Sequence, residues 1–425
     1  MIVILILSNE QKIELLIKIF YCLLILMPFI DFVNGLLINV GGPQIIGMFY
    51  RGFFIIFILV SLSIFYRYND LGLLKIYIVS FLLFFVLFIQ TFFLHGNPYF
   101  FTNDISVVLK LLLSLYIIEF SKKFIKGKSN KNYFDKTLFI YSITFPVLLL
   151  IPYFLGVGTS TYNNGGGYKG FFSATNDITI VFLLLNIFMG YTFFQSITNR
   201  KKYILNGLVY FANFSSLILI GTKTGILFGL IWFLFLYIKT VFFNKQASVV
   251  RRIKVLVITF LILFLSIFIF KNIFIEPLLN TYERFLYFYN LYSGNLIQFI
   301  SSSRSIFLEE AYRKLNEEPM KIIRFVFGNG FKYRIQNWGY GDLVEMDMFD
   351  TFFSLGIIGV GIVLLSYLQY FLLSIKRTFS IYSVSFWVLI LYSFFAGHVL
   401  YSALSSTLLG IVCAQLICKK DQERG

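Results

Sequence analysis

Long apolar runs constrain the fold of this chain more than any other feature. Each run holds about 18–22 mostly apolar residues, the length that an α-helix needs to cross a hydrocarbon core roughly 30 Å thick. Such runs predict an all-α, polytopic transmembrane protein with about twelve spans. The predicted spans lie near residues 13–30, 46–66, 73–94, 104–121, 136–155, 176–196, 203–220, 224–243, 253–271, 351–371, 379–396 and 398–418.

The composition also indicates a membrane protein. Of the 425 residues, 58% are hydrophobic and 13% are charged, whereas an ordinary soluble domain has about 25% charged residues. The net charge is +16, and the Lys and Arg residues cluster in short connections on alternate sides of the apolar runs. This positive-inside pattern sets topology and does not indicate a nucleic-acid partner. It predicts a multi-pass protein in a lipid bilayer, with both termini in the cytoplasm.

The connection between the ninth and tenth predicted spans is long. Residues 272–350 hold no adequate span, and the charge alternation places them outside, so we expect a large external loop there. The loop carries eight Lys or Arg residues and ten Asp or Glu residues. We therefore expect residues 1–425 to form a single polytopic membrane domain whose polar chemistry is concentrated in this loop.

The segment "SSSRSIFLEEAYRKLNEEP" in the loop predicts an amphipathic helix that lies on the outer membrane surface or over a cavity. Leu308, Ala311 and Leu315 follow one another at helical spacing, and Pro319 stops the pattern. Arg304 lies in the first turn on the apolar side, where a cation opposes the helix dipole. Two interpretations remain open. Arg304 binds an anion such as a lipid-linked phosphate, or it pairs with a nearby carboxylate.

Other cations stand in or beside apolar runs. Lys223, within "GTKTG", lies between two runs at the expected external face, against the positive-inside trend. Arg51 lies inside the second run, near its external end. Ionisable residues at such positions are functional candidates, although a side chain such as Arg51 can also reach the interface by snorkelling.

The stretch "EMDMFDTFFSLGIIG", from Glu345 to Gly359, places three carboxylates directly before an apolar run. We expect Asp350 to be the N-cap of the tenth span, where acids interact favourably with the helix dipole, by roughly 0.3–1 kcal/mol each. This accounts for Asp350 and Asp347 but not for Glu345, which lies too far upstream. Glu345 would act as a general base, or Glu345 and Asp347 would together bind a divalent cation. Two acids are a weak metal signal, so we expect no metal and no cofactor.

The ordered set of "GTKTG", "SSR" with an amphipathic helix, "GNG" and "EMDMFDTFFSLGIIG" resembles the bacterial O-antigen polymerase (Wzy) and O-antigen ligase superfamily. The resemblance covers mainly residues 170–360. In the ligase branch, the position eleven residues before the first glycine of the "GxxG" element is typically histidine, and here it is Glu345. The acidic form is similar to the polymerase branch.

The resemblance implies a membrane glycosyltransferase of the GT-C type in the bacterial cytoplasmic (inner) membrane. Such a polysaccharide polymerase, for O-antigen or capsule, transfers a growing glycan from undecaprenyl diphosphate onto a lipid-linked repeat unit at the external face. Its substrates are undecaprenyl diphosphate-linked oligosaccharides, and a chain-length regulator is an expected partner. Glu345 would be the base, oriented by Asp347 or Asp350. The residues expected to bind the diphosphate are Arg304, Lys223, Arg284, Arg324 and Arg51.

Two other functions compete with polymerisation. One is an O-antigen ligase, which would transfer the finished glycan to a lipid A core. The other is a flippase for the lipid-linked unit. Transporters usually bind their substrates at the bilayer midplane, among broken helices and buried charges. This chain instead gathers its charges in one large external loop, which argues against transport.

Overall fold

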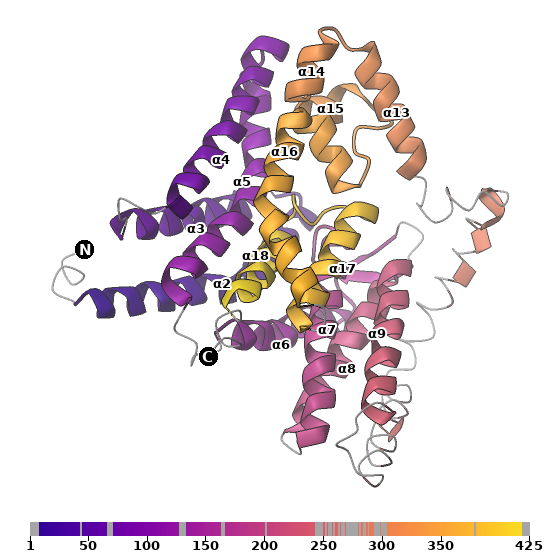
Figure 1. Ribbon diagram of the computed structural model, residues 1–425. Coiled ribbons are helices and arrows are strands. Elements are labelled where there is room, and N and C mark those ends of the chain that lie inside the picture. The colour runs from indigo at the N-terminus through magenta and orange to yellow at the C-terminus, as the bar shows by residue number, and fades with distance from the viewer. Residues whose placement is uncertain are drawn as a thin grey trace. The chain divides into compact units, whose positions relative to one another are not determined.

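The computed structural model describes most of the chain, and helices make up nearly all of the described backbone (Figure 1). The described residues form two compact units. The first unit comprises Met1–Leu24, Ile45–Asn132 and Tyr292–Gly425, and the second comprises Ile25–Gln44 and Tyr133–Leu291. The residues that the structure describes are 8–42, 45–65, 71–126, 133–162, 166–199, 202–242, 304–377 and 380–418, with scattered positions between 250 and 298.

The first unit is built around α5. Its helices, in chain order, are the start of α2 (Asn9–Asn39), α3 (Ile45–Ile64), α4 (Leu71–Ile89), η1 (Gln90–His95), α5 (Pro98–Phe120), η2 (Ser121–Ile125), α13 (Arg304–Glu317), α14 (Lys321–Phe327), α15 (Phe331–Asn337), α16 (Asp347–Lys376), α17 (Ile381–Phe395) and α18 (Ala403–Cys418). The central helix α5 packs against α3, α4 and α18. Helices α5 and α18 approach closely, because an added Cβ on Gly410 would lie 3.0 Å from the backbone oxygen of Ser114.

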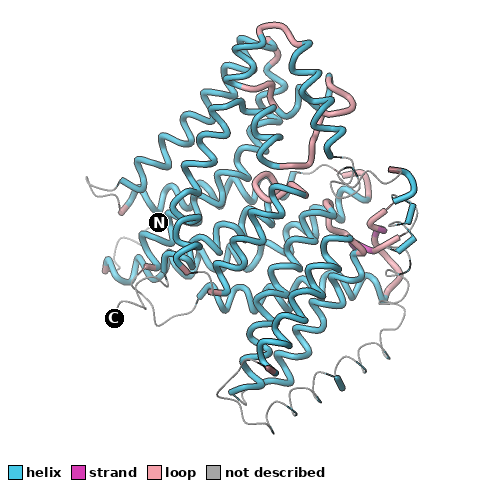
Figure 2. The backbone as a smooth tube through the Cα atoms, turned by 45° about the vertical axis from the view of Figure 1, so that its right-hand side comes forward, coloured by secondary structure: helices cyan, strands magenta, loops and turns pink. Residues whose placement is uncertain are grey.

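The second unit is built around α7. Its elements are the remainder of α2, α6 (Tyr133–Phe154), β1 (Thr159–Ser160), β2 (Tyr168–Gly170), α7 (Thr175–Asn199), α8 (Tyr203–Ile220) and α9 (Lys223–Val241). Helix α7 packs against α6, α8 and α9, and Phe193, Tyr210 and Leu236 meet in its core. The strands β1 and β2 pair antiparallel and form a small hairpin, the one sheet within the described residues (Figure 2).

The long apolar helices agree with most of the predicted spans. Nine helices in the described residues are long and apolar enough to cross a membrane, and they coincide with the first eight predicted spans and the tenth. The ninth predicted span, 253–271, lies mostly outside the described residues. Helices α17 and α18 coincide with the last two, but they have only 15 and 16 residues. The predicted start of the last span at 398 is wrong, because α18 begins at Ala403.

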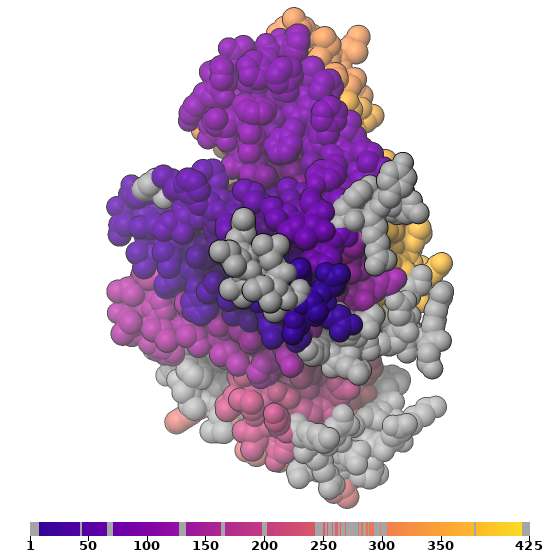
Figure 3. All heavy atoms as spheres, turned by 90° about the vertical axis from the view of Figure 1, so that its left-hand side faces the viewer, coloured from indigo at the N-terminus to yellow at the C-terminus, as the bar shows by residue number. Residues whose placement is uncertain are grey.

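Large apolar side chains point outward on α3 and α4, whose residues cover much of the face seen in Figure 3. Phe53, Ile56 and Phe81 are 58%, 60% and 67% exposed. In water such a surface would be an interaction or aggregation site, whereas lipid tails are as apolar as these side chains. Together with the lengths of the helices, this surface identifies a multi-pass membrane protein.

Helix α16 is broken at Gly356, whose φ of 68° and ψ of −170° are not helical. A glycine turn at residues 328–330, between α14 and α15, donates hydrogen bonds to α16 next to this break. The Asn329 N–H donates to the Phe353 carbonyl at 2.9 Å, and the Gly330 N–H donates to the Ser354 carbonyl at 2.9 Å. The turn therefore satisfies two carbonyl groups that the break in α16 leaves without helical partners.

The turn and the break fit together without space for side chains. An added Cβ on Gly356 would lie 2.1 Å from the Val326 carbonyl oxygen, and one on Gly328 would lie 2.4 Å from the Ser354 carbonyl oxygen. Both glycines also have positive φ angles, a conformation that other L-residues adopt only with strain. Glycine is therefore required at both positions by the backbone and by its neighbours.

We expect Gly356→Ala to lower the stability of the folded protein strongly. The left-handed backbone alone would destabilise an alanine by about 1–2 kcal/mol, and the collision with Val326 adds to this. Gly361→Ala is the matched control in the same helix, because no atom lies within 4 Å of its added Cβ. Thermal unfolding of the detergent-purified variants measures the effect. Equal melting temperatures for the two variants would contradict the requirement for glycine at position 356.

Candidate functional site

The loop helix α13 has the amphipathic pattern that the sequence predicts. It begins at Arg304, ends before Pro319, and buries its apolar face. The expectation that this face lies on the membrane or over a cavity is wrong, because residues around α15 and α16 cover it. The small core that results comprises Ala311, Leu315, Trp338, Val344 and Phe353.

Arg304 and Glu345 meet in an ion pair at the edge of this core. The Nη2 atom of Arg304 lies 2.8 Å from Oε2 of Glu345. The Arg304 side chain is 14% exposed and the Glu345 side chain is 41% exposed. Of the two interpretations of Arg304, the structure shows the pairing with a carboxylate. Because the carboxylate is accessible, a ligand can reach the pair from outside.

The backbone holds Glu345 in a left-handed conformation, with a φ of 58°. For a residue other than glycine this conformation costs of order 1–3 kcal/mol, so the surroundings must enforce it. Both neighbours of Glu345 are held by the same carboxylate. The Val344 N–H donates to Asp350 Oδ1 at 2.9 Å and the Met346 N–H donates to Asp350 Oδ2 at 3.2 Å. Asp350 therefore sets the position from which Glu345 projects.

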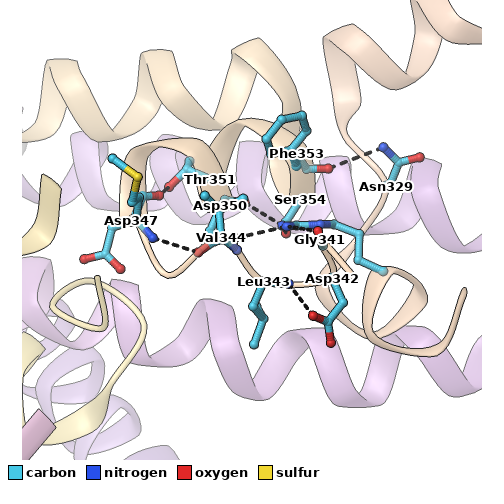
Figure 4. A network of polar contacts seen from close by, with 12 residues as sticks. Asn329, Gly341, Asp342, Leu343, Val344, Asp347, Asp350, Thr351, Phe353 and Ser354 are labelled. Carbon is cyan, nitrogen blue, oxygen red and sulfur yellow. Dashed lines mark hydrogen bonds and ion pairs between the residues drawn. The ribbon is translucent and has the colours of Figure 1, made fainter. Parts of the chain in front are cut away.

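Asp350, which is labelled in Figure 4, is itself paired with a fully buried arginine. Arg334 has no exposed surface, and its Nη2 lies 3.0 Å from Asp350 Oδ1, while its Nη1 donates to Ser354 Oγ at 2.6 Å. Burial lowers the pKa of Arg334 below its ordinary value, and the attraction of Asp350 opposes this shift. The expectation that Asp350 is the N-cap of the span is wrong, because α16 begins at Asp347. Its carboxylate instead folds back onto the preceding loop.

Asp347 is buried and holds a different segment. Its Oδ2 atom accepts hydrogen bonds from Ser393 Oγ at 2.7 Å, from the Val399 N–H at 2.8 Å and from the Leu400 N–H at 3.1 Å. In Figure 4 its carboxylate points away from Asp350. Asp347 thus ties the start of α16 to the irregular segment 396–402 between α17 and α18, which explains why α18 begins late.

Arg324, one of the predicted diphosphate-binding residues, is buried between protein groups. Its Nε donates to the Pro319 carbonyl at 2.8 Å, and its Nη1 donates to Asn329 Oδ1. Its Nη2 lies 3.4 Å from a carboxylate oxygen of Glu318. These contacts join the end of α13 to the glycine turn.

The other predicted cations lie elsewhere. Lys223 is the first residue of α9 in the second unit, directly after the N-cap Thr222. Arg51 lies within α3, where its guanidinium group packs beside Gly47. Arg284 lies outside the described residues. Within the first unit, Arg304 and Glu345 are the two predicted residues that the structure brings into direct contact.

The comparisons with known proteins point to the same region. Residues 289–423 match the family model described as O-antigen ligase like membrane protein. The match covers 135 of the 425 residues, and over this stretch the chain is similar to that family. The match spans α13 to α18 and so includes Arg304, Glu345, Asp347 and Asp350. A search of the curated proteins gave no match.

The match supports a membrane enzyme of an O-antigen ligase-like family. The matched region also contains His398, which sequence reasoning did not select as a site residue. The available signal was its position, since only Gly397 and His398 interrupt the last two apolar runs. Its neighbours in the chain are held by residues about fifty positions earlier: Gly397 packs against Glu345, and Val399 and Leu400 donate to Asp347.

We expect Arg334→Ala to lower the free energy of unfolding by about 3–5 kcal/mol, because it leaves the buried Asp350 charge without its partner. The control is Arg313→Ala on α13, which removes an exposed arginine paired with Glu310 and Glu317. Exposed ion pairs contribute little, so this variant should unfold like the wild type. Thermal unfolding in detergent compares the two, and a wild-type melting temperature for Arg334→Ala would refute the role of the buried pair.

Proposed function

We propose that this protein is a polysaccharide polymerase. It would transfer a growing glycan from undecaprenyl diphosphate onto a lipid-linked repeat unit at the external face of the bacterial cytoplasmic membrane, with both its termini in the cytoplasm. The observation that carries the proposal is the accessible Arg304–Glu345 pair, held on a rigid frame within the region that matches the family model. An acid at position 345, where the ligase branch typically has histidine, favours the polymerase branch.

The pair contains the two charges that the reaction needs. Arg304 offers a planar set of donors that suits a diphosphate, and a bound donor substrate would draw it away from Glu345. The freed Glu345 carboxylate would then accept the proton of the attacking sugar hydroxyl. The hydroxyl oxygen forms a bond to the anomeric carbon as the bond to the diphosphate breaks. Arg304 would stabilise the negative charge that develops on the departing diphosphate.

The buried residues around the pair would act as positioning residues. Asp350 holds the backbone on both sides of Glu345, and Asp347 holds the segment opposite. Arg324 pairs with Glu318 and donates to Asn329. We therefore propose that it stabilises the structure of the site and does not bind the diphosphate. Additional contacts to the lipid-linked substrate would come from Lys223, Arg284 and Arg51. A chain-length regulator remains the expected protein partner.

The alternative function is an O-antigen ligase, which the description of the matching family favours. The two activities leave different products in cells. A strain that lacks a polymerase can still attach single repeat units to its lipid A core, whereas a strain that lacks the ligase attaches none. Gel electrophoresis of surface polysaccharide from a deletion strain separates the two. Single repeat units on the core support a polymerase, and complete loss of glycan would overturn it.

We expect Arg304→Ala and Glu345→Gln to reduce chain growth at least about 100-fold, the usual contribution of a positioned acid–base or charged group. Arg313→Ala, on the exposed side of the same helix, is the matched control and should support wild-type chain lengths. Complementation of the deletion strain, with the protein level checked by immunoblotting, measures both. Full-length chains from either site variant would remove that residue from the mechanism.

A further inference from the structure

The short helix α14, in the external loop, exposes most of its apolar side chains. Ile322 is 82% exposed, and Ile323 and Phe325 are exposed as well. Met320, directly before the helix, is 60% exposed. Single exposed apolar residues are common on proteins, whereas a contiguous group of them marks an interaction site. We call these four residues the α14 patch.

The neighbouring helix α13 has the opposite arrangement. Glu310, Arg313 and Glu317 form ion pairs along its exposed side, and its apolar face is covered by the protein. In α14 the arginine is buried instead, because Arg324 is 3% exposed and donates to Asn329. Water favours exposed charges and buried apolar groups. The surface of α13 therefore suits water, whereas the surface of α14 suits an apolar surrounding.

The C-terminal end of α14 is attached to a membrane helix. The ring of Phe327, the last residue of α14, lies 6.5 Å from the ring of Phe85 in α4, measured between centroids. The side chain of Gln90, which begins η1, donates to the Phe327 carbonyl. Figure 1 shows α14 beside the upper end of α4. Because α14 has seven residues, it is only about 10 Å long, and the α14 patch lies close to this helix.

The apolar surface of the membrane helix extends past this attachment. Helix α4 and η1 form one long apolar segment, Leu71–His95. Phe92 and Phe93, which follow Gln90 in this segment, are both exposed. The surface that suits lipid therefore reaches at least as far along the segment as the contact with Phe327. The α14 patch continues that surface into the external loop.

The charge on α14 also fits a lipid surface. Of the two charged residues in α14, Arg324 is buried and Lys321 is exposed. A lysine among exposed apolar residues is typical of a segment in the membrane interface, where its stem lies beside acyl chains and its ammonium reaches the headgroups. Lysine is depleted in protein–protein interfaces, so the same residue disfavours a second copy of this chain as the occupant.

We propose that the α14 patch inserts into the outer leaflet of the bilayer and holds the external loop against the membrane. Lys321 pairs with the phosphate groups of the lipids. The membrane contact that the sequence predicted for α13 thus belongs to α14. Since α13 runs from Arg304 to its junction with α14, the inserted patch also sets the distance between the Arg304–Glu345 pair and the membrane surface. Contact of this kind does not depend on the reaction that the protein catalyses.

The first test uses the unaltered chain in nanodiscs of phosphatidylcholine and phosphatidylglycerol. Part of the phosphatidylcholine carries a photoreactive diazirine on an acyl chain. After illumination, mass spectrometry identifies the peptides to which lipid is attached. We expect attachment within residues 320–325 and within η1, which is the positive control, and no attachment within α13. Lipid on η1 without lipid on residues 320–325 would overturn the proposal.

The second test places an environment-sensitive fluorophore on the loop. The three cysteines of the chain are first replaced by alanine, and the fluorophore is attached at Ile322→Cys or at the control Arg313→Cys. Both positions are exposed, so neither label should change the melting temperature. In nanodiscs that hold one copy and no polyprenyl lipid, we expect the label at 322 to emit at shorter wavelength than the label at 313. Phospholipids with a nitroxide near the headgroup should quench only the label at 322.

The absence of other occupants makes this outcome specific to phospholipid. Equal emission and equal quenching at positions 322 and 313 would overturn the proposal, because α14 would then face water. A label at 322 that is quenched only after a polyprenyl phosphate is added would overturn it in favour of a site for the carrier lipid. A blue shift that appears only in nanodiscs with two copies would overturn it in favour of a dimer contact.

Discussion

The carboxylate of Asp350 is the interaction on which the geometry of the site depends. It lies in the first turn of α16 and accepts the N–H groups of Val344 and Met346 as well as the guanidinium of Arg334. Burying a charge is costly unless it is paired and its hydrogen-bonding capacity is used. Asp350 meets both conditions only when the preceding loop folds over it. The conformation of the loop that carries Glu345 is therefore determined by the hydrogen bonds that the buried Asp350 carboxylate requires.

The charges of this region divide by exposure into two groups with different tasks. Asp347, Asp350 and Arg334 are buried and bind groups of the protein itself. Glu345 and Arg304 pair with each other, and the carboxylate remains accessible. A buried group that already has all its partners has little capacity left for a substrate. An accessible ion pair can exchange its partners at small cost, as the proposed reaction with an anionic donor and a neutral hydroxyl would require.

The sequence predicted those features that depend on local patterns. Apolar run length located the long helices, and the spacing of Leu308, Ala311 and Leu315 located α13. The features that it did not predict depend on residues far apart in the chain. Asp347 bonds residues 46–53 positions later, and these bonds delay the start of α18. A sequence pattern cannot distinguish such an anchor from an acid that merely favours a helix N-terminus.

The break in α16 is where the loop helices are hydrogen-bonded to the long apolar helices of the first unit. An unpaired carbonyl group is especially costly beside lipid, so a broken span needs partners from elsewhere. Gln90, the first residue of η1, donates to the Ser354 carbonyl at 2.6 Å, and the glycine turn supplies the other donors.

The same turn continues into α15, where Asp104 of α5 accepts the N–H groups of Phe331 and Lys332. The glycine turn and the start of α15 are thus hydrogen-bonded to both α5 and α16. In the proposed reaction, substrates would come to this hydrogen-bonded frame, and Arg304 and Glu345 would exchange partners within it.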